Sequence, residues 1–156
     1  MLSDGGSKEE AALMMVKQIL ADKGTDVFTL PLESTGMDAV DALAKHNIGA
    51  LIIASPDMVI KGILSERDVV RAIWNKGPAA LDRPVAELMT TNVRTCTEES
   101  TVLEVMELMT EGRFRHLPVE RDGKLIGVVS IGDIVKRRIQ DIEREAEEIR
   151  SYIASA

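Results

Sequence analysis

The stretch from Gly62 to Asp68 reads GILSERD, and the stretch from Gly127 to Asp133 reads GVVSIGD. Both have the order Gly, two apolar residues, Ser, two variable residues and Asp. A Ser followed three residues later by an acidic residue is nearly a capping box, in which the two residues satisfy backbone N–H groups at the start of a helix. Each stretch therefore predicts a strand that runs directly into a helix.

The two junctions belong to an internal repeat, which is a primary guide to architecture. A shift of 66 positions places Val27 on Val93, Thr35 on Thr101 and Leu51 on Leu117. After one deletion the shift becomes 65, and Ser65 then falls on Ser130. We infer a duplicated unit of about 60 residues.

Hydrophobic periodicity and turn residues predict the same elements in both copies. The expected elements are a short helix (14–20 and 85–89), a strand (27–30 and 93–96), a helix after Thr35 or Thr101, two strands (48–53 with 60–64, and 116–119 with 125–129), and a closing helix after Ser65 or Ser130. The order is β-α-β-β-α, twice. One such unit leaves an apolar sheet face uncovered, whereas two units can bury those faces together.

Composition excludes several function classes. The chain has 156 residues, a net charge of −7 and a single cysteine, Cys96. The acidic balance disfavours nucleic acid, since phosphate backbones are bound by basic surfaces. We expect no internal disulfide, no membrane span and no signal peptide, and therefore a cytoplasmic protein.

Two interpretations of the junctions remain open at this point. Ser and Asp can be helix caps only. Alternatively, the helix N-terminus attracts phosphate, while an ionised Asp accepts hydrogen bonds from two ribose hydroxyls. A local basic cluster supports an anion site, but acidic residues are interspersed and a solvated loop is the other interpretation. The cluster is Arg113, Arg115, His116, Arg121 and Lys124.

The junctions resemble the G-h-x-[S/T]-x-x-D signature of CBS domains, and the tandem β-α-β-β-α order is similar to that family as well. The strings at Ser65–Asp68 and Phe114–Val119 resemble those of stand-alone bacterial CBS-pair proteins. The resemblance implies an α+β fold in which two motifs pack sheet to sheet as one pseudo-twofold module, with a long C-terminal helix. The expected domains are an N-terminal segment (1–15), motif 1 (16–74), a linker (75–84), motif 2 (85–139) and a helical extension (140–156).

The same resemblance implies a non-catalytic regulatory module that binds AMP, ADP, ATP or NAD(H), and it also brings S-adenosylmethionine into consideration. Asp68 and Asp133 are then expected at ribose hydroxyls. Ser65 and Ser130 are expected at ribose or phosphate. Adenine is expected near strand backbones and between apolar neighbours, and the cations are candidates for phosphate. These further residues are Val27, Ile48, Ala50, Ile63, Arg67, Val93, Phe114, Arg115, His116 and Val128.

The copies are not identical at these positions. Gly132 replaces Arg67, and Gly49 and Ala50 replace Arg115 and His116. We therefore expect two unequal sites, with more of the anion affinity in the second. No metal site is expected, because the two histidines have no ligand-like companions.

The C-terminal segment predicts an additional contact. Apolar residues recur in steps of three and four, which forms a two-heptad seam with charged flanks. The seam is Ile139, Ile142, Ala146, Ile149 and Ile153. Packing on its own module and pairing with a second copy are both open, and a homodimer with an unknown regulated partner is the favoured prediction. The rival function is a ligand-independent dimerisation scaffold.

Three single residues receive structural roles. His46 is expected to be structural or solvated, Cys96 is expected in the core, and Trp74 is expected to pack on a neighbouring element or subunit.

Overall fold

The computed structural model describes residues 14–155. The chain divides into two compact units, each assembled from separated pieces of sequence. The first-copy unit comprises Asp26–Thr95 and Pro118–Gly127. Within the described residues, the second-copy unit comprises 14–25, Cys96–Leu117 and 128–155. The prediction for the N-terminal segment, residues 1–15, lies almost entirely outside the described residues.

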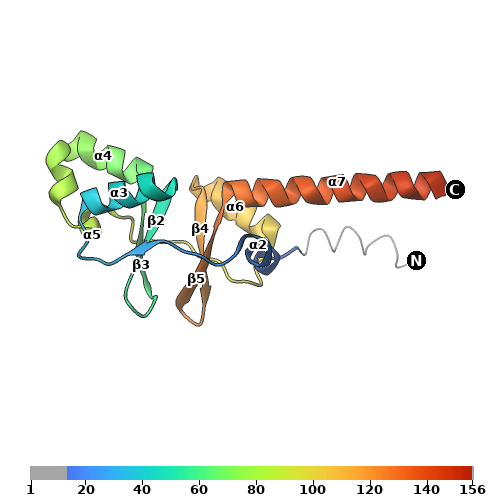
Figure 1. Cartoon of the computed structure of the whole chain (residues 1–156), viewed down its shortest axis with the longest axis horizontal. Coiled ribbons are helices and arrows are strands. Elements are labelled where there is room, and N and C mark those ends of the chain that lie inside the picture. The colour runs from blue at the N-terminus through green and yellow to red at the C-terminus, as the bar shows by residue number, and fades with distance from the viewer. Residues whose placement is uncertain (1–13, 156) are drawn as a thin grey trace. The chain divides into compact units, whose positions relative to one another are not determined.

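The first-copy unit contains a three-stranded sheet in the order β1-β2-β3. Strand β1 (Thr29–Leu30) pairs in parallel with β2 (Ala50–Ala54), and β2 pairs antiparallel with β3 (Ile60–Ser65). The helices of this unit gather around β2 and β3 (Figure 1). They are α3 (Gly36–His46), α4 (Glu66–Lys76), the 3-10 turn Pro78–Asp82 and α5 (Val85–Leu88).

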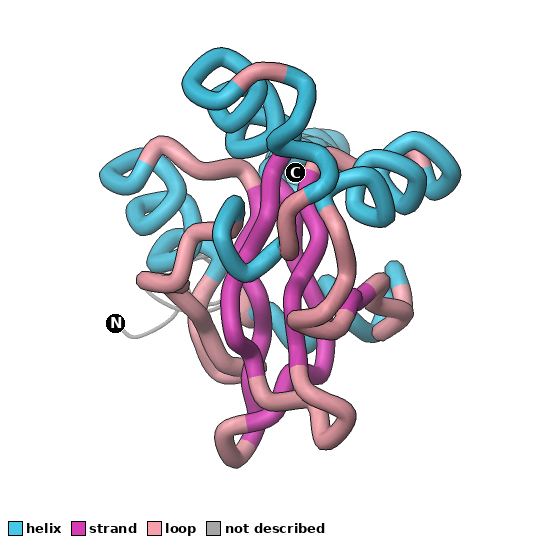
Figure 2. Tube along the Cα trace, turned by 90° about the vertical axis from the view of Figure 1, so that its left-hand side faces the viewer, coloured by secondary structure: helices cyan, strands magenta, loops and turns pink. Residues whose placement is uncertain are grey.

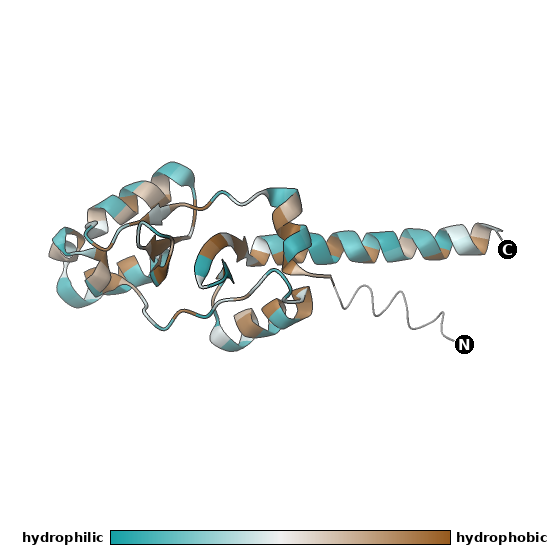
Figure 3. Cartoon of the chain, turned by 90° about the horizontal axis from the view of Figure 1, so that it is seen from below, coloured by the Kyte–Doolittle hydropathy of each residue, from teal (hydrophilic) through white to brown (hydrophobic). Residues whose placement is uncertain are grey.

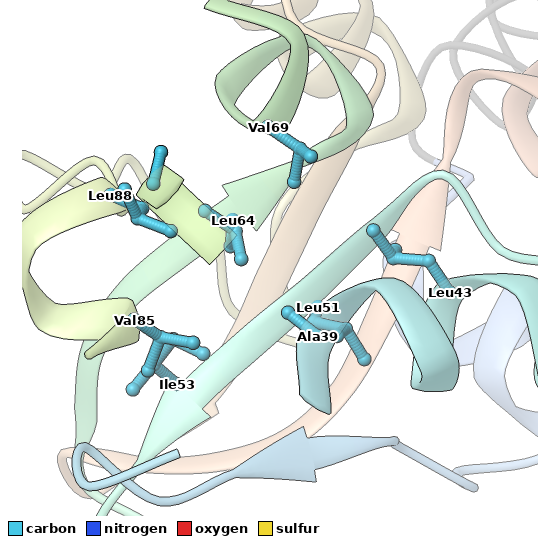
Figure 4. Packing of buried hydrophobic residues seen from close by; sticks show 9 residues of the cluster. Ala39, Leu43, Leu51, Ile53, Leu64, Val69, Val85 and Leu88 are labelled. Carbon is cyan, nitrogen blue, oxygen red and sulfur yellow. The ribbon is translucent and has the colours of Figure 1, made fainter. Parts of the chain in front are cut away.

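The core of this unit follows from the alternation of side chains along the strands. Leu51 and Ile53 on β2 and Leu64 on β3 are fully buried and meet apolar residues of the surrounding helices (Figure 4). The helices contribute Ala39, Leu43, Val69, Val85 and Leu88 to the same cluster. Leu64 at the end of β3 and Val69 at the start of α4 are both buried in this cluster. Their burial holds the Ser65–Asp68 junction, which lies between them, in place.

The second-copy unit is built on three helices, α2 (Val16–Lys23), α6 (Val102–Gly112) and α7 (Ile131–Ser155) (Figure 1). Strands β4 (His116–Arg121) and β5 (Lys124–Ser130) pair in a two-stranded sheet, and the part of this hairpin from Pro118 to Gly127 is grouped with the first-copy unit. Figure 2 shows the strands in magenta and the short loops that close each hairpin. The closing helix of the second copy and the expected C-terminal extension are one continuous helix of 25 residues.

Each short leading helix packs with the copy that it does not precede in sequence. Helix α2 lies ahead of the first copy, yet the Val16 N–H donates to Ser100 O (2.9 Å) and the Val102 N–H donates to Met14 O (2.8 Å). Helix α5 lies ahead of the second copy, yet the Val85 N–H donates to Ser34 O (2.7 Å). The two leading helices are therefore exchanged between the copies.

The tandem α+β architecture predicted from the sequence is confirmed, with one local difference. The strand expected at 93–96 is reduced to an isolated bridge at Cys96. Boundaries drawn along the sequence at 16–74 and 85–139 stay a prediction, because the spatial units cut across them. Among residues 14–155 no helix combines the length and apolarity needed to cross a membrane.

Candidate functional site

The junction of the first copy is a complete capping box. The Asp68 N–H donates to Ser65 Oγ (3.2 Å), and the Ser65 N–H donates back to Asp68 Oδ2 (2.8 Å). The Ser65 hydroxyl donates to the same carboxylate oxygen (3.0 Å). The predicted cap is present here, and among the described residues it leaves Asp68 Oδ1 with a single long contact, from Thr90 Oγ1 (3.5 Å).

The junction of the second copy repeats this geometry. The Asp133 N–H donates to Ser130 Oγ (3.1 Å), and the Ser130 N–H donates to Asp133 Oδ2 (2.8 Å). Both carboxylates thus lie in the first turn of a helix, where the helix dipole favours negative charge. Capping occupies part of each carboxylate and does not exclude a ligand at the remaining acceptor positions.

A cation that the sequence did not indicate contacts Asp133. The Lys23 ammonium, at the end of α2, lies 2.6 Å from Asp133 Oδ2 and 2.9 Å from Val128 O. Burial opposes ionisation of the Asp133 carboxyl, but hydrogen bonds from Lys23 and from the Ser130 backbone outweigh it and lower its pKa. The carboxylate is therefore ionised near neutral pH.

A cavity of about 350 Å³ adjoins this ion pair. Its size falls at the lower end of the range for small-molecule sites, about 300–1,000 Å³. Helices α2 and α7 line it through Ile19, Asp22, Lys23, Asp133, Lys136, Arg137 and Gln140. Arg137 holds the two helices together, since its guanidinium lies 3.1 Å from Asp22 Oδ2 and 3.5 Å from Asp141 Oδ1.

In the first copy, Thr90 reaches the groups equivalent to those that Lys23 contacts in the second. The Thr90 N–H donates to Ile63 O (2.9 Å), and the Thr90 hydroxyl is the long contact to Asp68. Gly62 permits this approach, because a Cβ there would lie 2.9 Å from Thr90 O. The glycine of the first junction thus allows close packing within the chain itself.

The two compact units divide the predicted residues by copy with one exception, Val93, which belongs to the second copy in sequence and lies in the first-copy unit. The first-copy unit holds Val27, Ile48, Ala50, Ile63, Ser65, Arg67, Asp68 and Val93, and the second-copy unit holds Phe114, Arg115, His116, Val128, Ser130 and Asp133.

Within each unit the first of the two central strands meets the junction. Ala50 pairs with Ser65 across β2 and β3, and the Glu66 N–H donates to Gly49 O (3.0 Å). In the second copy the Ile131 N–H donates to Arg115 O (2.8 Å). Val27 and Val93 are half-buried outside the strands, and the side chains of Arg67 and Arg115 are exposed.

The remaining single-residue predictions have mixed outcomes. His46 stacks on Phe28 with ring centroids 3.7 Å apart, which is a structural role. Cys96 is buried, and burial raises its thiol pKa to about 12. The prediction that Trp74 packs on another element of the chain is wrong, since 85% of its surface is exposed; a contact with a second subunit stays a prediction. The described residues contain no group of side chains arranged to hold a metal ion.

Lys23, Lys136 and Arg137 are the site residues that sequence reasoning missed. Lys23 lies at the end of the leading helix of motif 1, so nothing local indicates that it contacts the second copy. The duplicated exchange of the leading helices is visible only in three dimensions.

Comparisons with known proteins agree on the architecture. The sequence profile of the CBS domain matches residues 9–75 and 85–139. The CBS-domain containing protein ATU1752 from Agrobacterium tumefaciens is 45% identical, with a TM-score of 0.77 over 80% of this chain and 99% of that one.

Two further relatives bear on function. The mitochondrial CBS domain-containing protein CBSX3 of Arabidopsis thaliana is 38% identical over 78% of this chain, which spans 61% of that relative. The CBS domain pair of protein MJ0100, solved with 5-methylthioadenosine and S-adenosyl-L-methionine, is 28% identical, with a TM-score of 0.71 over 80% of this chain and 94% of that one.

Proposed function

Because the chain belongs to the CBS-domain family, we propose that it is a non-catalytic regulatory module that binds an adenine nucleotide, either AMP, ADP, ATP or NAD(H). The observation that carries the proposal is the duplicated junction, in which Ser65 with Asp68 and Ser130 with Asp133 begin a helix beside a strand carbonyl. The adenosine-type ligands of MJ0100 support this ligand class.

The chemistry of each junction suits a nucleoside. A carboxylate accepts hydrogen bonds from two adjacent ribose hydroxyls, and within residues 14–155 Asp68 Oδ1 has one long contact, with Thr90, to exchange for them. The apolar neighbours Ile63 and Val128 offer faces for adenine. The strand-end backbone near Ile48–Ala50 and Phe114–His116, next to each junction, is where we place the edge of the base.

Catalysis is not part of the proposal. Asp68 and Asp133 lie in different copies of the repeat, 65 residues apart in sequence, and each is held by the cap of its own helix. A general acid and base must both reach the same reacting group. Two carboxylates with matching caps are better explained as two copies of one binding residue.

Calorimetry tests the proposal directly. The protein is titrated with AMP, ADP, ATP, NAD, NADH and S-adenosylmethionine, and we expect saturable binding of at least one. The matched variants are Asp68→Asn and Asp133→Asn, each of which should weaken one site, because loss of a charged hydrogen bond costs about 1.5–3 kcal/mol. No heat with any ligand would favour the rival function, a dimerisation scaffold whose junctions are caps only.

The second part of the proposal is a homodimer formed through the heptad seam of α7. The seam residues Ile142, Ile149 and Ile153 are 50%, 60% and 69% exposed. Apolar positions recur along the otherwise polar helix in Figure 3. Charges of both signs flank the seam at Arg138, Glu143, Glu145 and Arg150, which suits pairing with an identical helix.

Sedimentation analysis tests the dimer. We expect Ile149→Asp to shift the protein toward monomer, because a carboxylate would be buried in an apolar seam. Ser151→Asp adds the same charge outside the seam and serves as the control. A wild-type chain that is monomeric at micromolar concentration would refute the homodimer while leaving nucleotide binding intact.

The regulated partner and a cytoplasmic location complete the proposal. The exposed apolar residues of α4, Val70 and Trp74, are a surface on which a partner could act.

Fractionation of cells that produce the full-length protein tests the cytoplasmic location. Recovery of the protein in an organelle would refute that location; the name of the relative CBSX3 indicates a mitochondrial location for that relative.

A further inference from the structure

We propose that Lys23 makes the second-copy site selective for anionic adenine ligands, by holding Asp133 and Val128 O until a ligand phosphate takes over its ammonium group. The inference rests on the proposed function and adds to it the residue that selects an anionic ligand over a neutral one at the second-copy site. Lys23 is a specificity-determining residue in this account.

The contacts of Lys23 carry the proposal. Its ammonium lies 2.6 Å from Asp133 Oδ2, the carboxylate that a ribose would need, and 2.9 Å from Val128 O, the strand carbonyl beside it. An adenine nucleoside that used Asp133 would therefore compete with Lys23. Breaking a charge-assisted hydrogen bond without replacement costs about tenfold in affinity.

An anionic ligand can provide that replacement. The cavity beside the pair is lined by three cations, Lys23, Lys136 and Arg137, and by two carboxylates, Asp22 and Asp133. Arg137 is already paired with Asp22 (3.1 Å). Lys136 is exposed and makes no ion pair with any residue between 14 and 155.

A phosphate in this cavity would accept the hydrogen bond that Lys23 now donates to Asp133. The same phosphate would also lie near a second cation, Lys136. A neutral nucleoside offers no such compensation, and a sulfonium ligand adds a like charge. The local charge balance therefore favours a phosphate-bearing nucleotide.

The first copy provides an internal comparison. There the residue that reaches Ile63 O and the Asp68 carboxylate is Thr90, which is neutral. No cation among the described residues pairs with Asp68. The first-copy site should accordingly discriminate little between a nucleotide and a nucleoside. The two sites then differ because a charged residue, Lys23, contacts Asp133, whereas a neutral residue, Thr90, contacts Asp68.

The test replaces Lys23 with the residue used by the first copy. Lys23→Thr and the control Lys17→Thr, an exposed lysine on the same helix, are made in an Asp68→Asn background that weakens the first site. AMP and adenosine are titrated by calorimetry at low salt. In the Lys23 variant we expect AMP to bind about tenfold more weakly and adenosine about tenfold more tightly, because Asp133 is no longer occupied.

The outcomes separate the two levels of the proposal. An unchanged ratio of AMP to adenosine affinity in Lys23→Thr, or equal loss for both ligands, would overturn the role of Lys23 while leaving nucleotide binding standing. Failure of the unmutated protein to bind any adenine ligand would overturn the proposed function itself, and this inference with it.

The Asp133 carboxyl pKa, followed by carbon-13 NMR without added ligand, is a second readout. It should rise in Lys23→Thr and stay unchanged in Lys17→Thr; no rise would show that the pair does not form in solution.

Discussion

The substitutions Asp68→Asn and Asp133→Asn should destabilise the protein unequally, although both remove a carboxylate from the same place in a duplicated capping box. In each variant the amide oxygen can still accept the hydrogen bond from the serine N–H. What each variant loses in common is a negative charge in the first turn of a helix, worth about 0.3–1 kcal/mol.

Asp133→Asn loses a second interaction, with the ammonium of Lys23 at 2.6 Å. A hydrogen bond between charged groups contributes about 1.5–3 kcal/mol when buried. The Lys23 side chain is 35% exposed and Asp133 is 22% exposed, so solvent screening reduces the expected contribution to about 1 kcal/mol. Asp133→Asn should therefore be about 1 kcal/mol less stable than Asp68→Asn, or about 2–4 °C lower in Tm for a chain of this length.

Urea denaturation without added ligand measures both variants, with Lys23→Met and the double variant completing a thermodynamic cycle. The coupling free energy between Lys23 and Asp133 should be about 1 kcal/mol at low salt and should fall as salt is added. Equal destabilisation of the two Asn variants, with no coupling to Lys23, would refute the reasoning that this ion pair distinguishes the two junctions.

Three further outcomes are expected. Ile53→Ala, at a fully buried position of β2, should cost about 2–5 kcal/mol in urea denaturation; a cost below 1 kcal/mol would contradict the described core. Gly62→Ala should cost about 1–3 kcal/mol, because its Cβ would lie 2.9 Å from Thr90 O, and unchanged stability would mean that the segment carrying Thr90 can move away. The lowered pKa of Asp133 stabilises the folded state above the unfolded-state value of about 3.9, and this stabilisation is lost as pH falls through the folded-state pKa. Acid titration of stability should thus be shallower in Asp133→Asn than in the wild type, and identical curves would contradict the linkage.

Local chemistry made much of the fold predictable from sequence. Ser65 with Asp68, and Ser130 with Asp133, identify helix starts because capping involves residues only three apart. The strands β2 to β5 follow from short apolar runs separated by turn residues, and the repeat is read from identities such as Leu51 and Leu117. The prediction of a strand at 93–96 was wrong because a strand forms only where a neighbouring strand pairs with it. Within 93–96, Cys96 alone forms such a bridge.

The candidate site was predictable only as far as its local part. The sequence by itself determined the duplicated junction and its two carboxylates, since these depend on neighbours along the chain. The tertiary structure decided that α2 covers the second copy and α5 the first, and hence that Lys23 contacts Asp133, 110 residues away. A short amphipathic helix buries its apolar face wherever a complementary surface is available, and its own sequence does not say which copy provides that surface.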